Sequence, residues 1–278
     1  VGMLYDIAED INDKARKLIE AFWPGPLTMV FKKAVKVPLT TTGGLDSVAV
    51  RMPSHSVATE MIRAAGVPIA APSANISGRP SPTLAKHVVE DMDGRIEMIL
   101  DGGNIAIGIE STIVDMTSEP PVILRPGYIT KEMLSEVLQE EVVIDPAILD
   151  LDSMAKPKAP GMKYKHYAPK ADMVIVDGKR DAVIQTINTM TEQMHMEQKK
   201  VAVIATEETK YAYCADVILC IGKRAEEDEI AKHMYKILRD CDELEVDVIY
   251  SECFQTPRIG QAIMNRLLKA AGHQVIHV

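Results

Sequence analysis

From residue 172 onward, short apolar runs alternate with amphipathic stretches, and this alternation restricts the fold more than any other feature. Val201–Ala205 and Asp216–Ile221 are typical apolar runs, and Asp181–Met196 has the apolar spacing of a helix. Uninterrupted apolar strands are buried on both faces, which indicates a parallel sheet covered by helices. Further strands are expected at 174–176, 247–250 and 275–278, and further helices at 230–238 and 259–271. We therefore expect a small Rossmann-like parallel α/β domain over 172–278, without a Gly-x-Gly-x-x-Gly nucleotide fingerprint.

A basic stretch precedes this region. Residues 156–170 hold five lysines, three prolines and no acidic residue, so neither a helix nor a strand is expected there. We expect a linker over 156–171. Two tyrosines and a histidine are more than a spacer requires, so a linker that also contacts another group is a second interpretation.

The first 155 residues have a different pattern. Strands are expected at 27–32, 47–52, 68–71, 98–101, 111–116 and 122–125, and helices at 8–22, 56–65, 83–91 and 130–138. Gly66 is expected to end the second helix, and Thr130 is expected to cap the last one. Short strands with helices between them predict an α+β domain around a mixed, twisted sheet.

Composition excludes several classes of protein. The chain of 278 residues has a net charge of −9, so a protein that binds nucleic acid or membranes through overall positive charge is disfavoured. A hydrophobic content of 47% excludes intrinsic disorder. There is no apolar run long enough to cross a membrane, and the first residues do not have the pattern of a signal peptide. Four cysteines without a C-x-x-C pair predict reduced structural thiols and a cytoplasmic protein.

Small polar residues follow the strand expected at 68–71. The segment Pro72–Gly78 contains Ser73, Asn75 and Ser77, whose side chains both donate and accept hydrogen bonds. A loop of this kind after a buried strand suits a ligand such as a phosphate, a carboxylate or a ribose. A simple Asx or Ser turn is an equal alternative at this point.

Two arginines lie in or next to strands of the first domain. Arg51 shares one face of its strand with Ser47, and Arg125 precedes a Pro-Gly turn. An arginine in a strand requires an anion or a carboxylate partner, so either a ligand site or a structural ion pair is expected. Ser111 and Thr112 add two hydroxyls at the start of another strand.

Common catalytic patterns are absent from the sequence. It has no Gly-x-x-x-x-Gly-Lys-Ser/Thr phosphate loop, no Gly-x-Ser-x-Gly elbow and no histidine or carboxylate cluster with metal-ligand spacing. We therefore expect no covalent catalytic residue and no protein metal site. Hydroxyls, amides and arginines orient anionic substrates and stabilise developing charge.

Taken in order, six motifs resemble those of one family. They are Phe22–Thr28, Val50–Pro53, Pro72–Gly78, Glu110–Thr112, Leu124–Gly127 and the linker residues 160–169. Together they are similar to the threonylcarbamoyl-AMP synthase family, in its long form with a YrdC-like domain and a C-terminal α/β domain. The resemblance covers essentially the whole chain.

The resemblance implies an ATP-dependent nucleotidyltransferase. L-threonine and bicarbonate would form a carbamate, which attacks ATP to give threonylcarbamoyl-AMP and pyrophosphate for tRNA modification. Mg²⁺ would accompany the ATP. The threonine and carbamate end would be held by Arg51, Ser73 and Ser111. The ATP would be held by Ser47, Asn75, Thr83, Arg125, His166 and Tyr167, the last two from a linker that lies over the site.

The resemblance also implies that this chain begins after a basic triphosphate-binding motif of the family. An inactive chain, or a first domain that folds poorly, is an expected consequence. Two alternatives stay open: carbamoyl-adenylate chemistry on another acceptor, and an RNA-binding or regulatory module of the same fold that uses the basic linker. tRNA or tRNA-modification proteins are the partners considered, and the sequence gives no oligomeric state.

Overall fold

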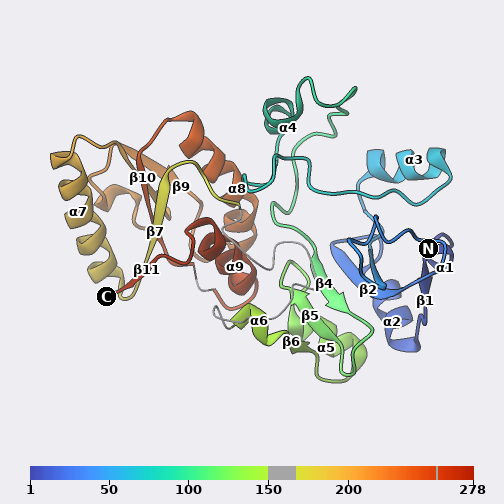
Figure 1. The fold of residues 1–278 in the computed structure, drawn as a ribbon. Helices are drawn as coiled ribbons and strands as arrows, with labels where there is room; N and C mark the ends of the chain where they lie inside the picture. The colour runs from blue at the N-terminus through green and yellow to red at the C-terminus, as the bar shows by residue number, and fades with distance from the viewer. Residues whose placement is uncertain (150–166, 255) are drawn as a thin grey trace. The chain divides into compact units, whose positions relative to one another are not determined.

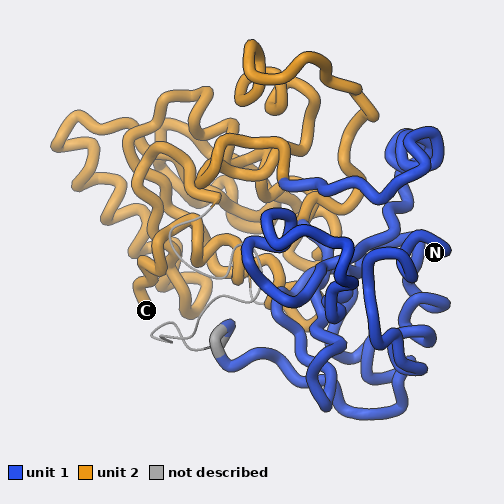
Figure 2. Tube along the Cα trace, turned by 45° about the vertical axis from the view of Figure 1, so that its right-hand side comes forward, with its two compact units in different colours: residues 1–72, 110–162 blue, residues 73–109, 163–278 orange. Residues whose placement is uncertain are grey.

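The computed structural model describes residues 1–149, 167–254 and 256–278, which form two compact units (Figures 1 and 2). The first unit contains residues 1–72 and 110–162, and the second contains residues 73–109 and 163–278. The segment 73–109 thus packs with the C-terminal region. The sequence domains expected at 1–155 and 172–278 stay a prediction. Within the described ranges, no helix has both the length and the apolar character needed to cross a membrane.

The first unit is built around a mixed sheet. Its strands are β1 (Ala8–Glu9), β2 (Leu27–Lys33), β3 (Ser47–Val50), β4 (Thr112–Asp115), β5 (Val122–Arg125) and β6 (Val143–Ile144). Its helices are α1 (Leu4–Ile7), α2 (Asp13–Phe22), α3 (Ser56–Ala65), α5 (Lys131–Leu138) and α6 (Pro146–Leu149). The strand order is β1-β2-β4-β5-β6, and β3 pairs with β2. β2 and β4 are parallel, whereas β2 and β3 are antiparallel, so the expected mixed sheet is confirmed.

Alternating apolar residues along the strands and side-chain caps at the helix ends explain the main elements of this unit. Leu27, Met29 and Phe31 on β2 are buried against the core, as the period of two predicts. Helix α2 begins at Asp13 because the Asn12 side chain accepts a hydrogen bond from Ala15 N at 2.9 Å. The helix expected over 8–22 is therefore too long at its start, where two residues form β1 instead.

The second unit contains the predicted parallel sheet. Its strands are β7 (Asp172–Asp177), β8 (Val201–Ala205), β9 (Val217–Cys220), β10 (Val248–Glu252) and β11 (Val275–His277). Its helices are α4 (Ala85–Met92), α7 (Arg180–Met196), the 3₁₀ helix η1 (Lys210–Ala212), α8 (Glu227–Glu243) and α9 (Gly260–Ala270). The strand order is β11-β7-β10-β8-β9, and every pair is parallel.

Helices cover both faces of this sheet, as the continuous apolar runs predict (Figure 1). On β8, Ala202 and Ile204 pack in a cluster that includes residues of α8 and α9. Val201 and Val203 point to the opposite face, in a cluster that includes Val183 of α7. The four cysteines form no disulfide within the described part of the chain.

Two expected strands do not form. Residues 68–71 and 98–101 have no strand conformation. Ile69, Met98 and Leu100 are 40%, 73% and 60% exposed, respectively. A strand needs a neighbour to satisfy its backbone N–H and C=O groups, and neither segment pairs with another strand in the described part of the chain. The sequence expectation was wrong at both places.

Candidate functional site

Three predicted site residues lie at one end of the mixed sheet in the first unit. Thr112 begins β4 and pairs with Leu27 at the start of β2. Antiparallel β3 ends beside Met29, and Arg51 follows it. Antiparallel β5 ends at Arg125, which pairs with Ile113. The sheet topology therefore brings Arg51, Ser111 and Arg125 to the same end.

Ser47 is placed differently. It begins β3 and pairs with Lys32 near the far end of β2. The length of β3 therefore separates Ser47 from Arg51. Because the two residues are four positions apart in an extended strand, they share one face, as the sequence predicted.

Ser111 and Arg125 are in direct contact. Arg125 Nε and Nη2 donate to Ser111 O at 3.1 and 3.0 Å, and Nη2 also donates to Ser111 Oγ at 3.3 Å. Ser111 Oγ is 2.7 Å from Thr28 Oγ1. Thr28 was given no function in the sequence analysis, although it ends the Phe22–Thr28 motif. Hydroxyls beside a guanidinium form a polar site suited to an anion.

Gly127 explains why two of the motifs occur together. A Cβ atom at this position would lie 2.5 Å from Thr112 N and 2.8 Å from Glu110 O. The Arg-Pro-Gly turn can therefore approach the start of β4 only with glycine. Thr112 is fully buried and donates to Ile129 O at 2.7 Å, so its hydroxyl supports this turn.

Arg51 has no hydrogen bond or ion pair to another described residue. Its side chain is exposed, although desolvation by the surrounding protein lowers the pKa of its guanidinium. The group keeps its charge at neutral pH all the same, because an arginine does not lose its proton there. The structural ion pair considered for Arg51 is therefore not found in the described part of the chain.

The other predicted residues lie on a loop of the second unit. Ser73 is exposed, whereas Asn75 and Thr83 are buried, at 9% and 6% exposure. Asn75 Nδ2 donates to Ile76 O at 2.9 Å and to Arg79 O at 3.2 Å. Gly78 has a φ of +92° within a turn that is closed by Arg79 N donating to Ile76 O. These bonds fix the loop conformation.

Three buried polar atoms of this region have no hydrogen-bond partner among the described residues. They are Asn75 Oδ1, Thr83 Oγ1 and His87 Nε2. His87 is fully buried on α4, and its Nδ1 accepts from Thr83 N at 3.2 Å. Burial lowers the pKa of His87 to about 4, with a contribution from the charge of Arg239, so the ring is neutral at pH 7. Buried polar atoms are nearly always satisfied, so these atoms require a ligand or an ordered water as a partner.

His87 is a residue that the sequence analysis missed. A lone histidine within a helical pattern gives no signal of its own, and the contact with Thr83 appears only in the structure. His166 lies outside the described residues. Tyr167 is 3% exposed, and its ring centroid lies 5.2 Å from that of Tyr235. The neighbouring Ala168 N donates to Gly78 O at 2.9 Å. This bond connects the end of the linker to residues 73–83, which we call the polar loop.

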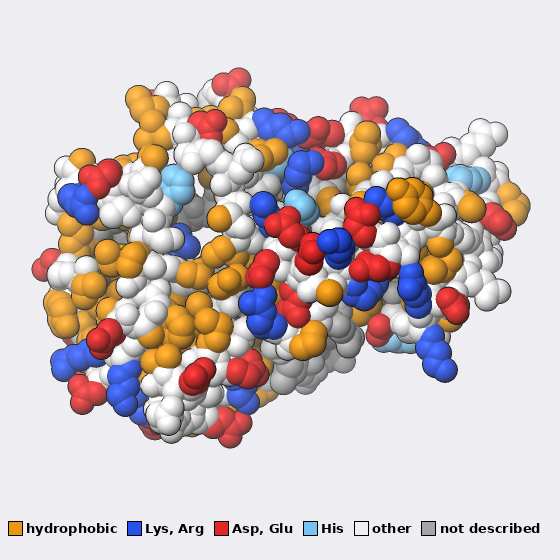
Figure 3. Space-filling model, turned by 180° about the vertical axis from the view of Figure 1, so that it is seen from behind, with side chains coloured by type: hydrophobic (Ala, Val, Ile, Leu, Met, Phe, Trp, Pro, Cys, Tyr) orange, Lys and Arg blue, Asp and Glu red, His pale blue; other side chains and the backbone are white. Residues whose placement is uncertain are grey.

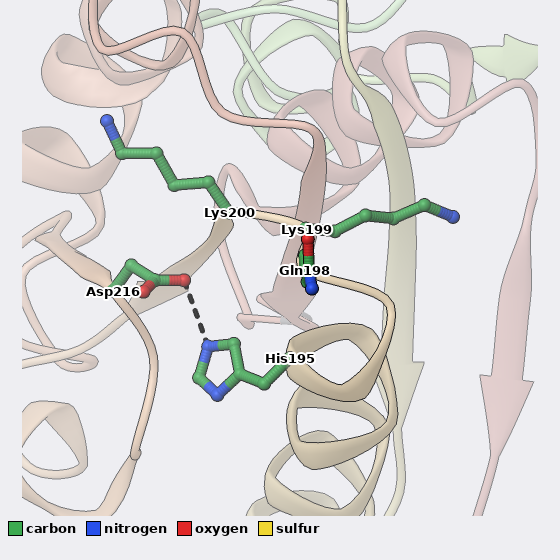
Figure 4. Close-up of a pocket in the computed structure, with 5 residues that line it drawn as sticks. All are labelled: His195, Gln198, Lys199, Lys200 and Asp216. Carbon is green, nitrogen blue, oxygen red and sulfur yellow. Dashed lines mark hydrogen bonds and ion pairs between the residues drawn. The ribbon is translucent and has the colours of Figure 1, made fainter.

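A separate pocket of about 330 Å³ opens in the second unit beside the start of β8 (Figure 4). It is lined by His195, Gln198, Lys199, Lys200 and Asp216. Its charged groups are already engaged: His195 Nε2 lies 2.9 Å from Asp216 Oδ2, and Lys200 Nζ donates to Leu244 O at 2.6 Å. Lys199 pairs with Glu197 at 2.7 Å. None of the predicted site residues lines this pocket.

No group of three or more metal-ligating side chains gathers in the ranges that the structure describes.

Comparison with known proteins identifies the family. Residues 1–127 match the family model described as "Telomere recombination", and residues 129–272 match "Threonylcarbamoyl-AMP synthase, C-terminal domain". The threonylcarbamoyl-AMP synthase of Pyrococcus abyssi is 47% identical over 98% of this chain and 78% of its own length. That of Bacillus subtilis is 44% identical over 99% of this chain and 78% of its own length.

A solved structure gives the same result. The crystal structure of P. abyssi Sua5 complexed with L-threonine matches with a TM-score of 0.92 and 46% identity, over 100% of this chain and 79% of that chain. The chain belongs to the threonylcarbamoyl-AMP synthase family.

Proposed function

We propose that this protein forms threonylcarbamoyl-AMP from L-threonine, bicarbonate and ATP. The amino group of threonine and bicarbonate give a carbamate with loss of water. A carbamate oxygen then bonds to the α-phosphorus of ATP, the bond from that phosphorus to the bridging oxygen breaks, and pyrophosphate leaves. The step needs substrates held in line and charge stabilised, and it needs no covalent intermediate on the protein.

The main support for ATP binding is a pair of buried oxygens without a hydrogen-bond donor among the described residues, Asn75 Oδ1 and Thr83 Oγ1. A nucleoside offers donors of the right kind, namely ribose hydroxyls and an amino group on the base. Arg125 and Ser47, with His166 and Tyr167 of the linker, would complete the ATP site. Mg²⁺ would arrive with the phosphates, since it binds mainly through nucleotide oxygens and water.

The threonine end is assigned to Arg51, Ser73 and Ser111. An exposed guanidinium without a partner among the described residues suits the carboxylate of an amino acid. Ser111 Oγ lies beside this end of the sheet and already contacts Thr28. These hydroxyls would orient the carbamate oxygen toward the nucleotide.

The product would supply the threonylcarbamoyl group for an adenosine of tRNA in the cytoplasm, and tRNA-modification proteins are the expected partners. On the face drawn in Figure 3, lysine and arginine side chains are interspersed with acidic ones. The described residues on this face therefore form no continuous basic surface of the kind that an RNA-binding module uses.

Pyrophosphate release from ATP tests the proposal. The full-length protein is assayed with bicarbonate and Mg²⁺, with and without L-threonine. We expect release that depends on threonine and a product in which the α-phosphate of ATP is bonded to threonylcarbamate. Release of pyrophosphate without threonine, or none from a folded protein, would contradict the proposal.

A further inference from the structure

Arg239 is a fully buried arginine on α8, in the part of the second unit that follows the linker. It is 1% exposed. Its Nε and Nη2 donate to Pro80 O at 3.0 and 2.7 Å, and Nη2 also donates to Asp91 Oδ2 at 2.8 Å. One guanidinium therefore holds a backbone carbonyl of the polar loop and a carboxylate of α4.

Asp91 extends this link to the loop residues that surround the unpartnered oxygens. It is 1% exposed, and its Oδ2 accepts a hydrogen bond from Ile76 N at 3.2 Å. Arg79 also donates to Asp91. Ile76 follows Asn75 directly, and Pro80 precedes Thr83 by three residues. The Arg239–Asp91 pair is thus attached to the loop between the two proposed ATP-binding residues.

The charges of this pair are matched. Burial opposes ionisation of Asp91, but the hydrogen bond and charge of Arg239, the N–H of Ile76 and the charge of Arg79 together lower its pKa. Asp91 is therefore ionised at neutral pH and holds its partners strongly. A lysine could supply the charge at position 239, but its single ammonium lacks the planar fork that reaches both Pro80 O and Asp91.

We propose that Arg239 is a positioning residue for the substrate loop 73–83. It carries no contact to substrate and acts by fixing Ile76 and Pro80, so that Asn75 and Thr83 present their oxygens in one geometry. The α/β region after the linker then contributes to the reaction through helix α8. The inference rests on the proposed function, because that function makes the loop a nucleotide site.

Three substitutions test it in the full-length protein. Arg239→Met removes the fork, Arg239→Lys keeps only the charge, and Asp91→Asn breaks the pair with little change in shape. We expect kcat/KM for ATP to fall about 10- to 100-fold in Arg239→Met, because small displacements of binding groups have effects of this size. Arg239→Lys should recover part of the loss. Asp91→Asn should resemble Arg239→Met.

Lys236→Met is the matched control. Lys236 lies on the same helix and pairs with Asp240 at 2.6 Å within that helix. This variant should leave kcat/KM for ATP unchanged. Hydrogen exchange at the Ile76 amide gives a second measurement, which a general loss of stability would not confine to the loop. Exchange at Ile76 should be faster in Arg239→Met than in the control, while amides of β8 and β10 keep their protection.

The outcomes separate the two proposals. If the wild-type protein shows no threonine-dependent pyrophosphate release, the proposed function fails, and the substrate part of this inference fails with it. If the wild type is active but Arg239→Met is folded and has wild-type kcat/KM for ATP, the positioning proposal is overturned. Unchanged exchange at Ile76 in a folded Arg239→Met would overturn it as well. If Arg239→Met does not fold, Arg239→Lys and Asp91→Asn decide by the same two criteria.

Discussion

Two buried polar clusters of the second unit differ in how their hydrogen bonds are satisfied. Glu252, the last residue of β10, is 2% exposed and accepts from Tyr213 OH at 2.9 Å, from Thr209 Oγ1 and from Arg224. Both carboxylate oxygens of Glu252 are therefore satisfied by side chains of the same cluster. In the other cluster, Asn75 Oδ1 and Thr83 Oγ1 are buried without a partner among the described residues.

This difference is our reason for giving the Glu252 cluster a structural role and for proposing the Asn75–Thr83 cluster as a ligand site. The Glu252 cluster lies at the carboxyl end of a parallel strand, which is where open α/β sheets commonly bind ligands. Its polar groups are already used, so position alone does not make it a site. The Asn75–Thr83 cluster lies on a loop, and its unsatisfied oxygens require a partner from outside the described residues.

The largest effect on stability is expected in the Glu252 cluster. Glu252→Gln keeps the shape but removes the charge that Arg224 and two hydroxyls share. We expect a loss of about 3 kcal/mol in the free energy of unfolding, because hydrogen bonds to a charged group contribute about 1.5–3 kcal/mol each. ATP affinity should not change. Urea unfolding and calorimetric titration with ATP measure the two quantities, and a weaker ATP affinity in the folded variant would contradict the structural assignment.

His87, which contacts Thr83 in the Asn75–Thr83 cluster, is expected to make the stability of the protein depend on pH. The pKa of His87 is about 4 in the folded protein and 6.5 in a model peptide. Below pH 6.5 the unfolded chain therefore binds a proton that the folded protein does not, so stability falls as the pH decreases from 6.5 to 4. The loss from this group is about 3 kcal/mol when the pH falls below 4.

His87→Asn isolates this contribution, since asparagine can still accept from Thr83 N and does not titrate. Unfolding free energies are measured at several pH values between 7 and 4. The lowered pKa of Asp91 adds a loss of stability that begins below about pH 5, but Asp91 is present in both proteins, so the difference between wild type and variant still reports His87. Identical pH slopes in wild type and variant would show that His87 is not held neutral.

Arg51→Ala should lower threonine-dependent kcat/KM by about 100-fold, which is the size expected when one charge-stabilising group is removed. Because Arg51 has no partner among the described residues, the free energy of unfolding should change little. Arg63→Ala is the control, since that exposed arginine pairs with Glu60 three residues before it. A stability loss without a change in activity would restore the structural interpretation of Arg51.

A matched pair of threonines gives the smallest effect and the sharpest comparison. Thr83→Val removes an unsatisfied hydroxyl, so we expect ATP affinity to fall about tenfold and stability to be unchanged or slightly higher. Thr209→Val removes a hydroxyl that donates to Glu252, so stability should fall by about 1–3 kcal/mol with ATP affinity unchanged. If Thr83→Val lowered only stability and Thr209→Val lowered only ATP affinity, the Asn75–Thr83 cluster would be structural and the Glu252 cluster would bind the ligand.

The strands were predictable where an apolar run in the sequence also finds neighbouring strands to pair with in the fold. Val201–Ala205 is a strand as predicted, because other apolar strands pair on both sides of it. Residues 68–71 are comparably apolar but find no neighbouring strand, and periodicity cannot show whether a partner exists. The start of α2 was also misplaced, since the Asn12 cap was overlooked.

Residue types indicated candidates for the site, whose roles stay a prediction, but they did not reveal how these residues are connected. Asn75 and Arg125 were candidates because amides and arginines in loops suit anionic ligands, whereas Thr83 was added only by the family resemblance. His87 and Arg239 were missed, since each acts on the loop from a helix and carries no motif of its own. Arg239 lies about 160 positions from Pro80, so only the tertiary structure reveals the bond between them.

Hydrogen exchange of the wild-type protein with and without ATP and Mg²⁺ tests the central claim most directly. We predict that ATP slows exchange at the amides of residues 75–83, where the unsatisfied oxygens lie. Amides around Thr209 and Glu252 should exchange at the same rate in both conditions. Slower exchange around Glu252, with none at residues 75–83, would contradict the account.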